Sequence, residues 1–488
     1  MSATLQNLAA SSGVLFGTSG ARGLVAQMSD AICYAYAQAF IRAVATGANR
    51  VVIGHDLRPS SPAMAAACAQ AVSDAGMEVV FVGPMPTPGV AFYAASLHAP
   101  AIIITGSHIP FDRNGIKFYR ADGEITKADE QAMLETAVDV PADLANRLAN
   151  KPQHVIAPDA LSAYSDRYIE FFGQGALQGM RVAIYEHSSV ARDILRSVLE
   201  ALGAEVISLG RTDNFVPIDT EAVRPEDIAK AKQWAAEHQF DAILSTDGDA
   251  DRPLIGDEQG LWLRGDVVGI LCAQYLGANV VVTPVSSNTA VEKCGAFQKV
   301  IRTRIGSPYV IAGMEMAIHQ AAQTAENPKP VVVGYEANGG FLLGSDVIRN
   351  GKPLTVLPTR DAILPMLALL CMARERGCKL SELSQHFPKR FTASDRLQAF
   401  PTPDSHALID RLLHDSIAAA ALLAPQSGEA IATDTTDGLR ITFSNGDIVH
   451  LRPSGNAPEL RCYVEADSVE RAEALCNSCL GRIRQEQK

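Results

Sequence analysis

Short apolar runs rich in β-branched residues alternate along the chain with alanine-rich stretches that have helical spacing. Clear examples of the apolar runs are residues 50–54, 101–105, 181–185 and 279–283. Strands that alternate with helices in this way are typical of α/β layers built around parallel strands. The pattern therefore predicts a protein made mainly of α/β layers.

The same arrangement occurs three times. Residues 50–83 and 181–210 each have a strand, a turn and a helix, and both end in a second apolar run closed by glycine. A looser copy covers residues 278–306. Repetition of one unit at wide spacing indicates repeated domains, so we expect three similar mixed α/β domains.

The pattern changes after about residue 375. Residues 439–443 and 447–451 have the short alternating runs of hairpin strands, and a helical pattern begins at Val469. We expect a C-terminal α+β domain with an antiparallel sheet. A chain of 488 residues also exceeds what one hydrophobic core usually serves.

Polar stretches at residues 150–154 and 257–260 suggest where the domains end. The predicted domains are listed here in chain order: 1–152, 153–262, 263–378 and 379–488.

Charge and composition exclude several classes of protein. The formal net charge of −12 argues against binding to the phosphate backbone of nucleic acids. The N-terminal residues lack the basic and apolar regions of a signal peptide, and no apolar run is long enough to span a membrane. We expect a cytoplasmic protein that binds neither nucleic acid nor membrane.

The nine cysteines are scattered and odd in number, which favours reduced thiols over a disulfide framework. Cys476 and Cys479 form a C-x-x-C pair inside the predicted last helix, without a second pair or histidines nearby. A zinc site therefore does not fit this spacing.

The first segment that suggests chemistry is Thr105-Gly-Ser-His-Ile-Pro, which follows a buried strand and is continued by Asn114-Gly-Ile-Lys117. Ser107 is a candidate nucleophile or phosphate carrier, and His108 and Lys117 are candidates for proton transfer. The alternative is an ordinary polar turn after a strand. An esterase elbow is excluded because G-x-S-x-G is absent.

The second segment places Asp247, Asp249 and Asp251 at alternate positions after the strand at residues 242–244. Three neighbouring carboxylates repel one another unless a cation lies among them, and oxygen ligands favour Mg²⁺ or Ca²⁺ over zinc. An EF-hand is excluded because Arg252 stands where that loop requires glycine. A solvated acidic loop remains the alternative.

The third segment is a glycine-flanked loop in which Glu336 and Asn338 follow a strand. The pair could bind neighbouring sugar hydroxyls, or it could be part of an ordinary loop.

The fourth segment combines donors suited to phosphate. These are two arginine side chains, hydroxyl and amide groups, and the backbone N–H groups of a turn, from Arg452, Ser454, Gly455, Asn456 and Arg461. The alternative is a surface turn.

Together these segments resemble the α-D-phosphohexomutase family over the whole chain. The resemblance is carried by Phe16-Gly-Thr-Ser-Gly-Ala-Arg-Gly23, by the T-G-S-H-I-P and N-G-I-K segments, by D-G-D-x-D-R at 247–252 and by the last two loops. It implies a phosphohexomutase whose four domains each contribute one loop to a central cleft.

The resemblance also implies roles for individual residues. Ser107 would carry the phosphoryl group, and an oxygen of that group would join the three aspartates as a ligand of Mg²⁺. Catalysis would involve His108, Lys117, Arg22 and Arg252, sugar binding would involve Glu336, Asn338 and Ser307, and phosphate binding would use the fourth segment. A hexose 1,6-bisphosphate would be the intermediate and activator, and the protein would be a monomer or homodimer.

Three loops depart from the common family pattern and affect only the expected sugar. The sugar loop lacks the usual serine and histidine, the phosphate loop reads R-P-S-G-N-A-P, and the 304–307 turn has no histidine or lysine. We expect interconversion of mannose 6-phosphate and mannose 1-phosphate, with glucose and glucosamine phosphates as alternative substrates.

Two functions of another class are disfavoured. An inactive sugar-phosphate-binding protein would have lost Ser107 or an aspartate, and a kinase would need a nucleotide-binding loop that is absent here.

Overall fold

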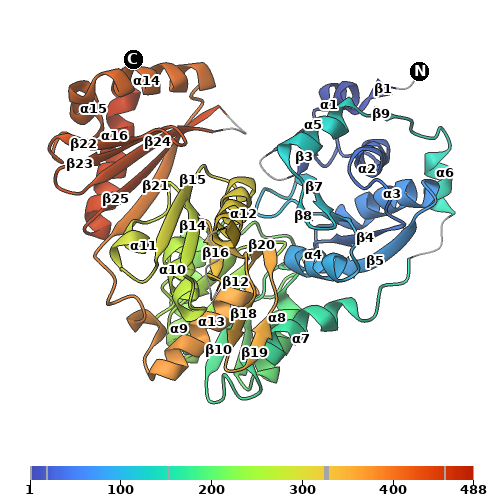
Figure 1. Ribbon diagram of the computed structural model, residues 1–488, viewed down its shortest axis with the longest axis horizontal. Helices are drawn as coiled ribbons and strands as arrows, with labels where there is room; N and C mark the ends of the chain where they lie inside the picture. The colour runs from blue at the N-terminus through green and yellow to red at the C-terminus, as the bar shows by residue number, and fades with distance from the viewer. Residues whose placement is uncertain (1–2, 18–19, 151–153, 324–328, 455–457, 487–488) are drawn as a thin grey trace. The chain divides into compact units, whose positions relative to one another are not determined.

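The computed structural model describes residues 3–17, 20–150, 154–323, 329–454 and 458–486. It divides into two compact units, which are described separately. The first contains residues 1–277 and 338–383, and the second contains residues 278–337 and 384–488 (Figure 1).

The first unit begins with a mixed sheet in the order β2-β3-β7-β6-β4-β5, with β8 paired to β7. Strands β4, β5 and β6 run parallel, and β7 returns antiparallel beside β6. The strands are β2 (Leu15–Phe16), β3 (Ala21–Leu24), β4 (Arg50–His55), β5 (Glu78–Pro84), β6 (Ala101–Ile104), β7 (Arg113–Arg120) and β8 (Gly123–Glu124). A small pair, β1 (Ala3–Thr4) and β9 (Ala137–Val138), accompanies this sheet.

A second sheet of the same unit repeats this plan in the order β11-β10-β12-β13. Strands β10 (Arg181–Tyr185), β11 (Glu205–Leu209) and β12 (Ala242–Thr246) are parallel, and β13 (Pro253–Gly256) is antiparallel to β12. In both sheets a buried parallel strand thus ends in a loop that returns along an antiparallel neighbour. The predicted serine and aspartate segments are these two loops.

Helices surround these strands. Those of the first unit are α1 (Leu5–Ser12), α2 (Asp30–Ala43), α3 (Ser61–Asp74), α4 (Thr87–Ser96), α5 (Lys127–Glu135), α6 (Leu144–Ala149), α7 (Ala160–Phe172), α8 (Arg192–Ala201), α9 (Pro225–His238), α10 (Gly265–Tyr275), α13 (Ile363–Arg376) and the short η1 (Leu380–Glu382). Its remaining strands are β17 (Phe341–Leu343), β18 (Val347–Arg349), β19 (Lys352–Leu354) and β20 (Leu357–Asp361).

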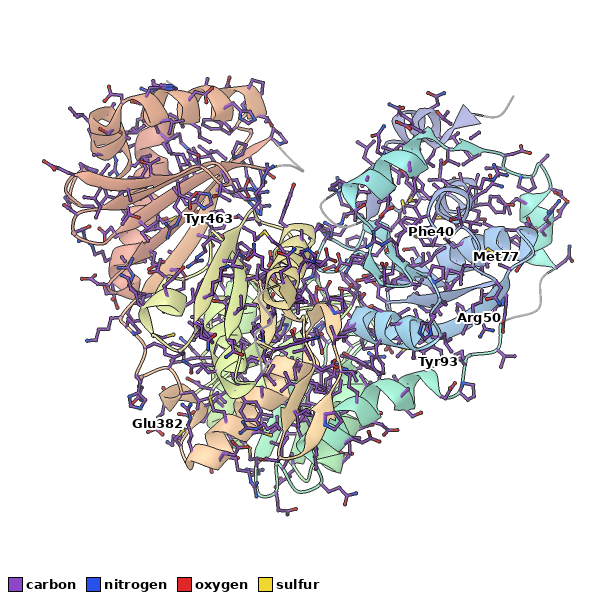
Figure 2. All side chains as sticks on the ribbon, in the orientation of Figure 1. Phe40, Arg50, Met77, Tyr93, Glu382 and Tyr463 are labelled. Carbon is purple, nitrogen blue, oxygen red and sulfur yellow. The ribbon has the colours of Figure 1, made fainter. Side chains whose placement is uncertain are left out.

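The core of the first domain lies between its helices and sheet. Phe40, labelled on α2 in Figure 2, is fully buried. Its ring lies tilted against that of Phe118 of β7, with ring centroids 5.0 Å apart. Helix α2 is apolar on several sides because it packs against both α3 and the sheet, which agrees with its many buried residues.

The second unit contains the third parallel repeat and the C-terminal sheet. Strands β14 (Val280–Pro284), β15 (Lys299–Thr303) and β16 (Val332–Tyr335) are parallel, with α11 (Ala290–Lys293) and α12 (Ser307–Gln323) beside them. The antiparallel sheet has the order β21-β25-β24-β23-β22. Its elements are β21 (Phe391–Gln398), β22 (Ala430–Asp434), β23 (Leu439–Phe443), β24 (Ile448–Pro453) and β25 (Glu459–Ala466), with α14 (Thr402–His414), α15 (Ser416–Leu423) and α16 (Val469–Glu486).

The three parallel repeats and the C-terminal antiparallel sheet confirm the predicted fold class. The boundaries proposed at 152, 262 and 378 stay predictions. Within the described part of the chain, every helix is too short or too polar to cross a membrane.

Candidate active site

The serine loop connects β6 to β7. Ser107 is buried, and its φ of 51° lies in the left-handed region that non-glycine residues rarely adopt. Its N–H donates to Thr105 Oγ1 at 2.8 Å. Backbone strain of this kind costs of order 1–3 kcal/mol and persists where the surroundings hold it, commonly at functional sites.

Arg58 is the group that holds this loop. Its buried guanidinium donates to four backbone carbonyls, with distances of 2.8 Å to Pro110 and Arg113, 3.0 Å to Ser107 and 2.6 Å to Ile109. The sequence analysis did not identify Arg58. The available signal was the charged pair two residues apart after β4, Asp56 and Arg58, which lie 3.4 Å apart in the structure.

Gly106 allows this contact. A Cβ atom at position 106 would lie 2.5 Å from Cζ of Arg58, so any larger residue would push the guanidinium away. Asp56 also accepts the N–H of Gly106 at 3.3 Å.

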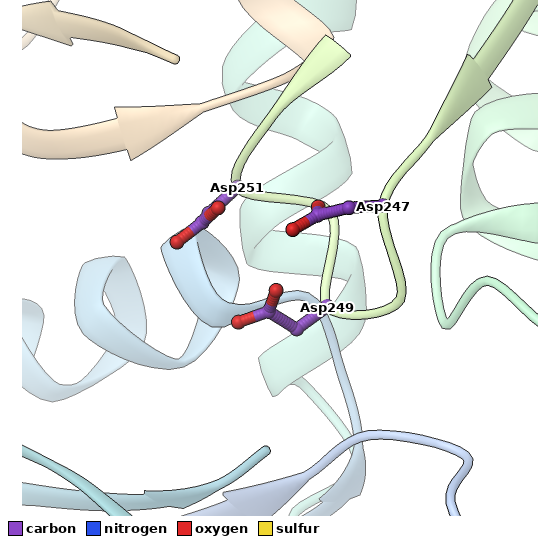
Figure 3. A group of neighbouring side chains, drawn as sticks. All are labelled: Asp247, Asp249 and Asp251. Atoms are coloured by element: carbon purple, nitrogen blue, oxygen red, sulfur yellow. The ribbon is translucent and has the colours of Figure 1, made fainter. Parts of the chain in front are cut away.

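The aspartate loop connects β12 to β13 and meets the serine loop. The carboxylates of Asp247, Asp249 and Asp251 turn toward a common space, and one oxygen of each lies within 4.8 Å of the others (Figure 3). All three are buried, and Ser107 Oγ donates to Asp247 Oδ2 at 2.5 Å. Two segments 140 positions apart thus form one site.

Lys117 lies between two of these carboxylates. Its Nζ is 2.7 Å from Oδ2 of Asp249 and 2.7 Å from Oδ2 of Asp251. Burial alone would lower the pKa of Lys117, but the two carboxylates outweigh burial and raise it. The ammonium is therefore a charged donor between the two carboxylates, and the predicted role of Lys117 in proton transfer stays a prediction.

His108 is uncharged, in contrast to Lys117. Its Nδ1 lies 3.2 Å from Ser107 Oγ. Burial, followed by the positive charge of Arg252, lowers the pKa of His108 to about 3. The imidazole is therefore neutral at physiological pH, with its Nδ1 beside the Ser107 hydroxyl.

Three arginines complete the charge balance. Arg252 Nε lies 3.6 Å from Asp251 Oδ1, and Arg360 Nη2 lies 2.8 Å from Asp251 Oδ2. Burial, followed by the positive charges of Arg252 and Arg360, lowers the pKa of Arg22 to about 10. Arg360 comes from β20, far along the chain, and no local motif indicated it.

The aspartates fit a hard divalent cation. Oδ1 of Asp249 and Oδ1 of Asp251 are buried without a hydrogen-bond partner, which is costly for a carboxylate unless a cation uses the oxygen. Burial, followed by Asp249 and Asp251, raises the pKa of Asp247, as expected for crowded anions. In the described residues this is the one group of acidic, histidine or cysteine side chains that could hold a metal, and Cys476 and Cys479 are free thiols within α16.

The predicted sugar residues lie in different surroundings. Glu336 is buried after β16 in the second unit, and Asn338 begins the return of the chain to the first unit. Asn338 Oδ1 accepts from Gly340 N–H at 2.9 Å, which leaves its amide NH₂ as the donor for a ligand. Ser307 is fully buried at the start of α12, whereas the Arg304 side chain of the same turn is 57% exposed. The predicted contact between Ser307 and the sugar stays a prediction.

The phosphate segment forms the connection between β24 and β25. Arg452 and Arg461 are direct partners in this antiparallel pair, and Ser454 N–H donates to the carbonyl of Glu459 at 2.8 Å. The structure thus brings together the two arginines and Ser454, while Gly455 and Asn456 lie outside the described residues.

Asp437, in the turn between β22 and β23, joins this segment to the 304–307 turn. Its Oδ2 lies 2.8 Å from Arg452 Nε and accepts the N–H of Ile305 at 3.0 Å. His450 Nε2–H donates to the carbonyl of Asp437 at 2.5 Å and holds the turn. The sequence analysis did not identify Asp437, because it lies 15 residues before Arg452 on another strand connection.

Family models match nearly the whole chain. The matching descriptions are phosphoglucomutase/phosphomannomutase alpha/beta/alpha domain I at 13–141, domain II at 163–260, domain III at 264–391 and the C-terminal domain at 412–480. The chain belongs to the phosphoglucomutase/phosphomannomutase family. This confirms the predicted family, and with it an intramolecular phosphotransferase of the phosphohexomutase type.

Relatives agree with this family. The chain is 46% identical to a phosphomannomutase of Salmonella muenchen, over 97% of this chain and 96% of the relative. It is 45% identical to a phosphomannomutase of Sinorhizobium fredii, over 95% and 97%, but only 30% identical to a phosphoglucosamine mutase of Pelobacter propionicus, over 76% and 81%. A solved phosphoglucomutase/phosphomannomutase family protein of Burkholderia thailandensis shares the fold, with a TM-score of 0.71 at 19% identity over 96% and 97% of the two chains.

Proposed function

We propose that this phosphohexomutase is a phosphomannomutase that uses Mg²⁺ and interconverts mannose 6-phosphate and mannose 1-phosphate through phosphorylated Ser107. The observation that carries the proposal is the contact between the strained, buried Ser107 and the carboxylate of Asp247. Mannose is supported by the two phosphomannomutases at 45–46% identity, set against phosphoglucosamine mutases at about 30%.

The aspartates would hold the metal, and Mg²⁺ when bound would neutralise charge on the transferring phosphoryl group. Arg252, Arg360 and Lys117 supply fixed positive charge at the same place, where burial strengthens electrostatic stabilisation. His108, next to Ser107, and Lys117, between Asp249 and Asp251, are the candidates for moving the proton of the attacking hydroxyl.

In the proposed cycle the free hydroxyl of the sugar attacks the phosphorus on Ser107. The bond from phosphorus to Ser107 Oγ breaks as the new bond to the sugar oxygen forms, which produces a hexose 1,6-bisphosphate. The bisphosphate then reverses its orientation and returns its other phosphoryl group to Ser107. Positioning and charge neutralisation supply most of the catalysis in such transfers.

Recognition must tolerate both orientations of the sugar. Arg452, Ser454 and Arg461, with Gly455 and Asn456, would bind the phosphate that is not being transferred, through charge-assisted bonds. Glu336 and Asn338 would bind hydroxyls that mannose, glucose and glucosamine have in common, so this loop alone cannot distinguish these sugars.

Kinetics in one preparation test the proposal. We expect the highest kcat/KM for mannose 1-phosphate, with glucose 1-phosphate within about a hundredfold, a gap of about 2.7 kcal/mol. Glu336→Ala should lower kcat/KM by the same factor for mannose 1-phosphate, glucose 1-phosphate and glucosamine 1-phosphate. A preference for glucosamine 1-phosphate would overturn the assignment of the sugar, and absence of mutase activity with all three would overturn the function.

A further inference from the structure

The register of the C-terminal sheet aligns a third arginine with the two of the phosphate segment. Arg461 on β25 is paired with Arg452 on β24 and, on its other side, with Arg396 on β21. Residues directly opposite each other in antiparallel strands point to the same face, with Cβ atoms about 4.5–5.5 Å apart. The three arginine side chains therefore form one row, which we call the arginine row.

The arginine row lies on the face of the sheet away from the C-terminal core. The residues that alternate with it, Leu397, Leu451 and Leu460, are buried in the core formed with helices α14 to α16. Tyr463, labelled on this sheet in Figure 2, lies two positions from Arg461 and therefore shares its face. The side chains of Arg396, Arg461 and Arg452 are 48%, 35% and 17% exposed, so ligands in solvent can reach the row.

Three guanidinium groups side by side repel one another unless anions accompany them. Two carboxylates do so: Asp437 Oδ2 lies 2.8 Å from Arg452 Nε, and Glu459 lies 3.5 Å from Arg396 Nε and 4.0 Å from Arg461 Nη2. Asp437 also lies 3.9 Å from Arg304 Nε, so its negative charge is shared between two guanidinium groups. A phosphate dianion bound by several guanidinium forks would relieve the repulsion within the arginine row.

We propose that Arg396 is a third guanidinium ligand of the phosphate that is not being transferred. The inference rests on the proposed function, in which Arg452 and Arg461 bind this phosphate, and adds a residue that no sequence motif indicated. Arg396 lies at the more exposed end of the arginine row, so its contribution is charge and hydrogen bonding to the ligand, with little part in the packing of the sheet.

The experiment compares Arg396→Ala and Arg396→Lys with Arg452→Ala in steady-state kinetics with mannose 1-phosphate. The matched control is Arg411→Ala, an arginine of the same domain that is 51% exposed and paired with Glu486 on the helices. We expect Arg396→Ala to raise KM about three- to tenfold with kcat within about twofold. The KM of Arg396→Lys should lie between those of Arg396→Ala and the unchanged protein. Arg411→Ala should change neither KM nor kcat.

Calorimetric titration of mannose 1-phosphate into the Ser107→Ala protein gives the same comparison without turnover. The double variant Ser107→Ala/Arg396→Ala should bind mannose 1-phosphate more weakly than Ser107→Ala alone, by the same factor by which Arg396→Ala raises KM. The melting temperatures of these two proteins should be equal. If Arg452→Ala raises KM and Arg396→Ala does not, the inference is wrong while the proposed function stands. If neither variant changes KM or affinity, the phosphate binds elsewhere and both the inference and the proposed phosphate site fall.

Discussion

Two regions of the molecule concentrate charged side chains and differ in how deeply they bury them. The first is the transfer centre, formed by Ser107, Lys117 and the three aspartates, and the second is the arginine row. At the transfer centre Asp249, Asp251 and Lys117 are at most 4% exposed and contact each other directly. In the arginine row, Arg461 and Arg396 are 35% and 48% exposed, and Glu459 lies 4.0 Å and 3.5 Å from them.

This difference corresponds to the two tasks of a mutase. Phosphoryl transfer gains most from charges that are fixed before the reaction in a site protected from water. Recognition of a sugar that binds in two orientations needs donors that solvent and ligand can reach. Under the proposed function, the buried contacts would serve the chemistry and the exposed Arg396 and Arg461 would serve recognition, whereas Arg452, 2.8 Å from Asp437, is fixed like the groups of the transfer centre.

The largest effect is expected from removal of the phosphoryl carrier. Ser107→Ala should lower kcat about a thousandfold or more, since Ser107 Oγ contacts both the Asp247 carboxylate and Nδ1 of His108. Intact mass should show one phosphate on a fraction of the unchanged protein and none on the variant. Ser96→Ala, a helix hydroxyl bonded to the Tyr93 carbonyl, is the control. Phosphate mapped to another residue, with activity retained, would contradict the assignment.

Removal of one metal ligand should have the next largest effect. Asp249→Asn should weaken Mg²⁺ binding in calorimetry, and turnover, by at least about tenfold, because its unpartnered Oδ1 loses its charge. EDTA should abolish turnover reversibly. Asp213→Asn, at a 94% exposed carboxylate of the same domain, should behave as the unchanged protein. Full turnover in metal-free buffer would exclude the metal site.

A smaller effect should follow from disturbing the support of the serine loop. Gly106→Ala places a methyl group 2.5 Å from Arg58 Cζ, and we expect kcat to fall about five- to tenfold with KM within about twofold. Arg58→Lys should act in the same direction because it loses the planar fork.

The control for this pair is Gly481→Ala, where an added Cβ meets nothing within 4 Å. A rise in KM at constant kcat would show that Arg58 acts on ligand recognition. The serine loop would then serve recognition as well as chemistry, and the proposed difference between the transfer centre and the arginine row would be weakened.

The smallest effect at neutral pH concerns the turn that carries Asp437. Burial lowers the pKa of His450 to about 4 from 6.5, so the folded state keeps this histidine neutral. Stability is complete above pH 6.5 and falls as the pH drops toward 4, by about 2 kcal/mol at pH 5.

Calorimetry at pH 7 and pH 5 should therefore show a smaller drop in melting temperature for His450→Gln than for the unchanged protein. His406→Gln, at an exposed histidine of α14, should retain the full drop. Equal drops in all three proteins would show that His450 does not titrate on unfolding.

The amino-acid sequence by itself determined the strands, the repeated α/β plan and the positions of the four loops, because each depends on local pattern. An apolar run that ends in Gly-Ser-His or Asp-Gly-Asp shows where a strand stops and which groups stand at its end. These predictions agree with β6, β12 and the loops that follow them.

Only the tertiary structure decided which residues from distant parts of the sequence lie beside these loops. Arg58 and Arg360 reach the transfer centre from other strands, and Arg396 joins Arg461 through a register that sequence spacing does not reveal. The fold likewise encloses Ser307, and it places Lys117 between two carboxylates that raise the pKa of its ammonium against the effect of burial. Local pattern carries the preferences of each segment, whereas neighbours, desolvation and charge balance are properties of the packed chain.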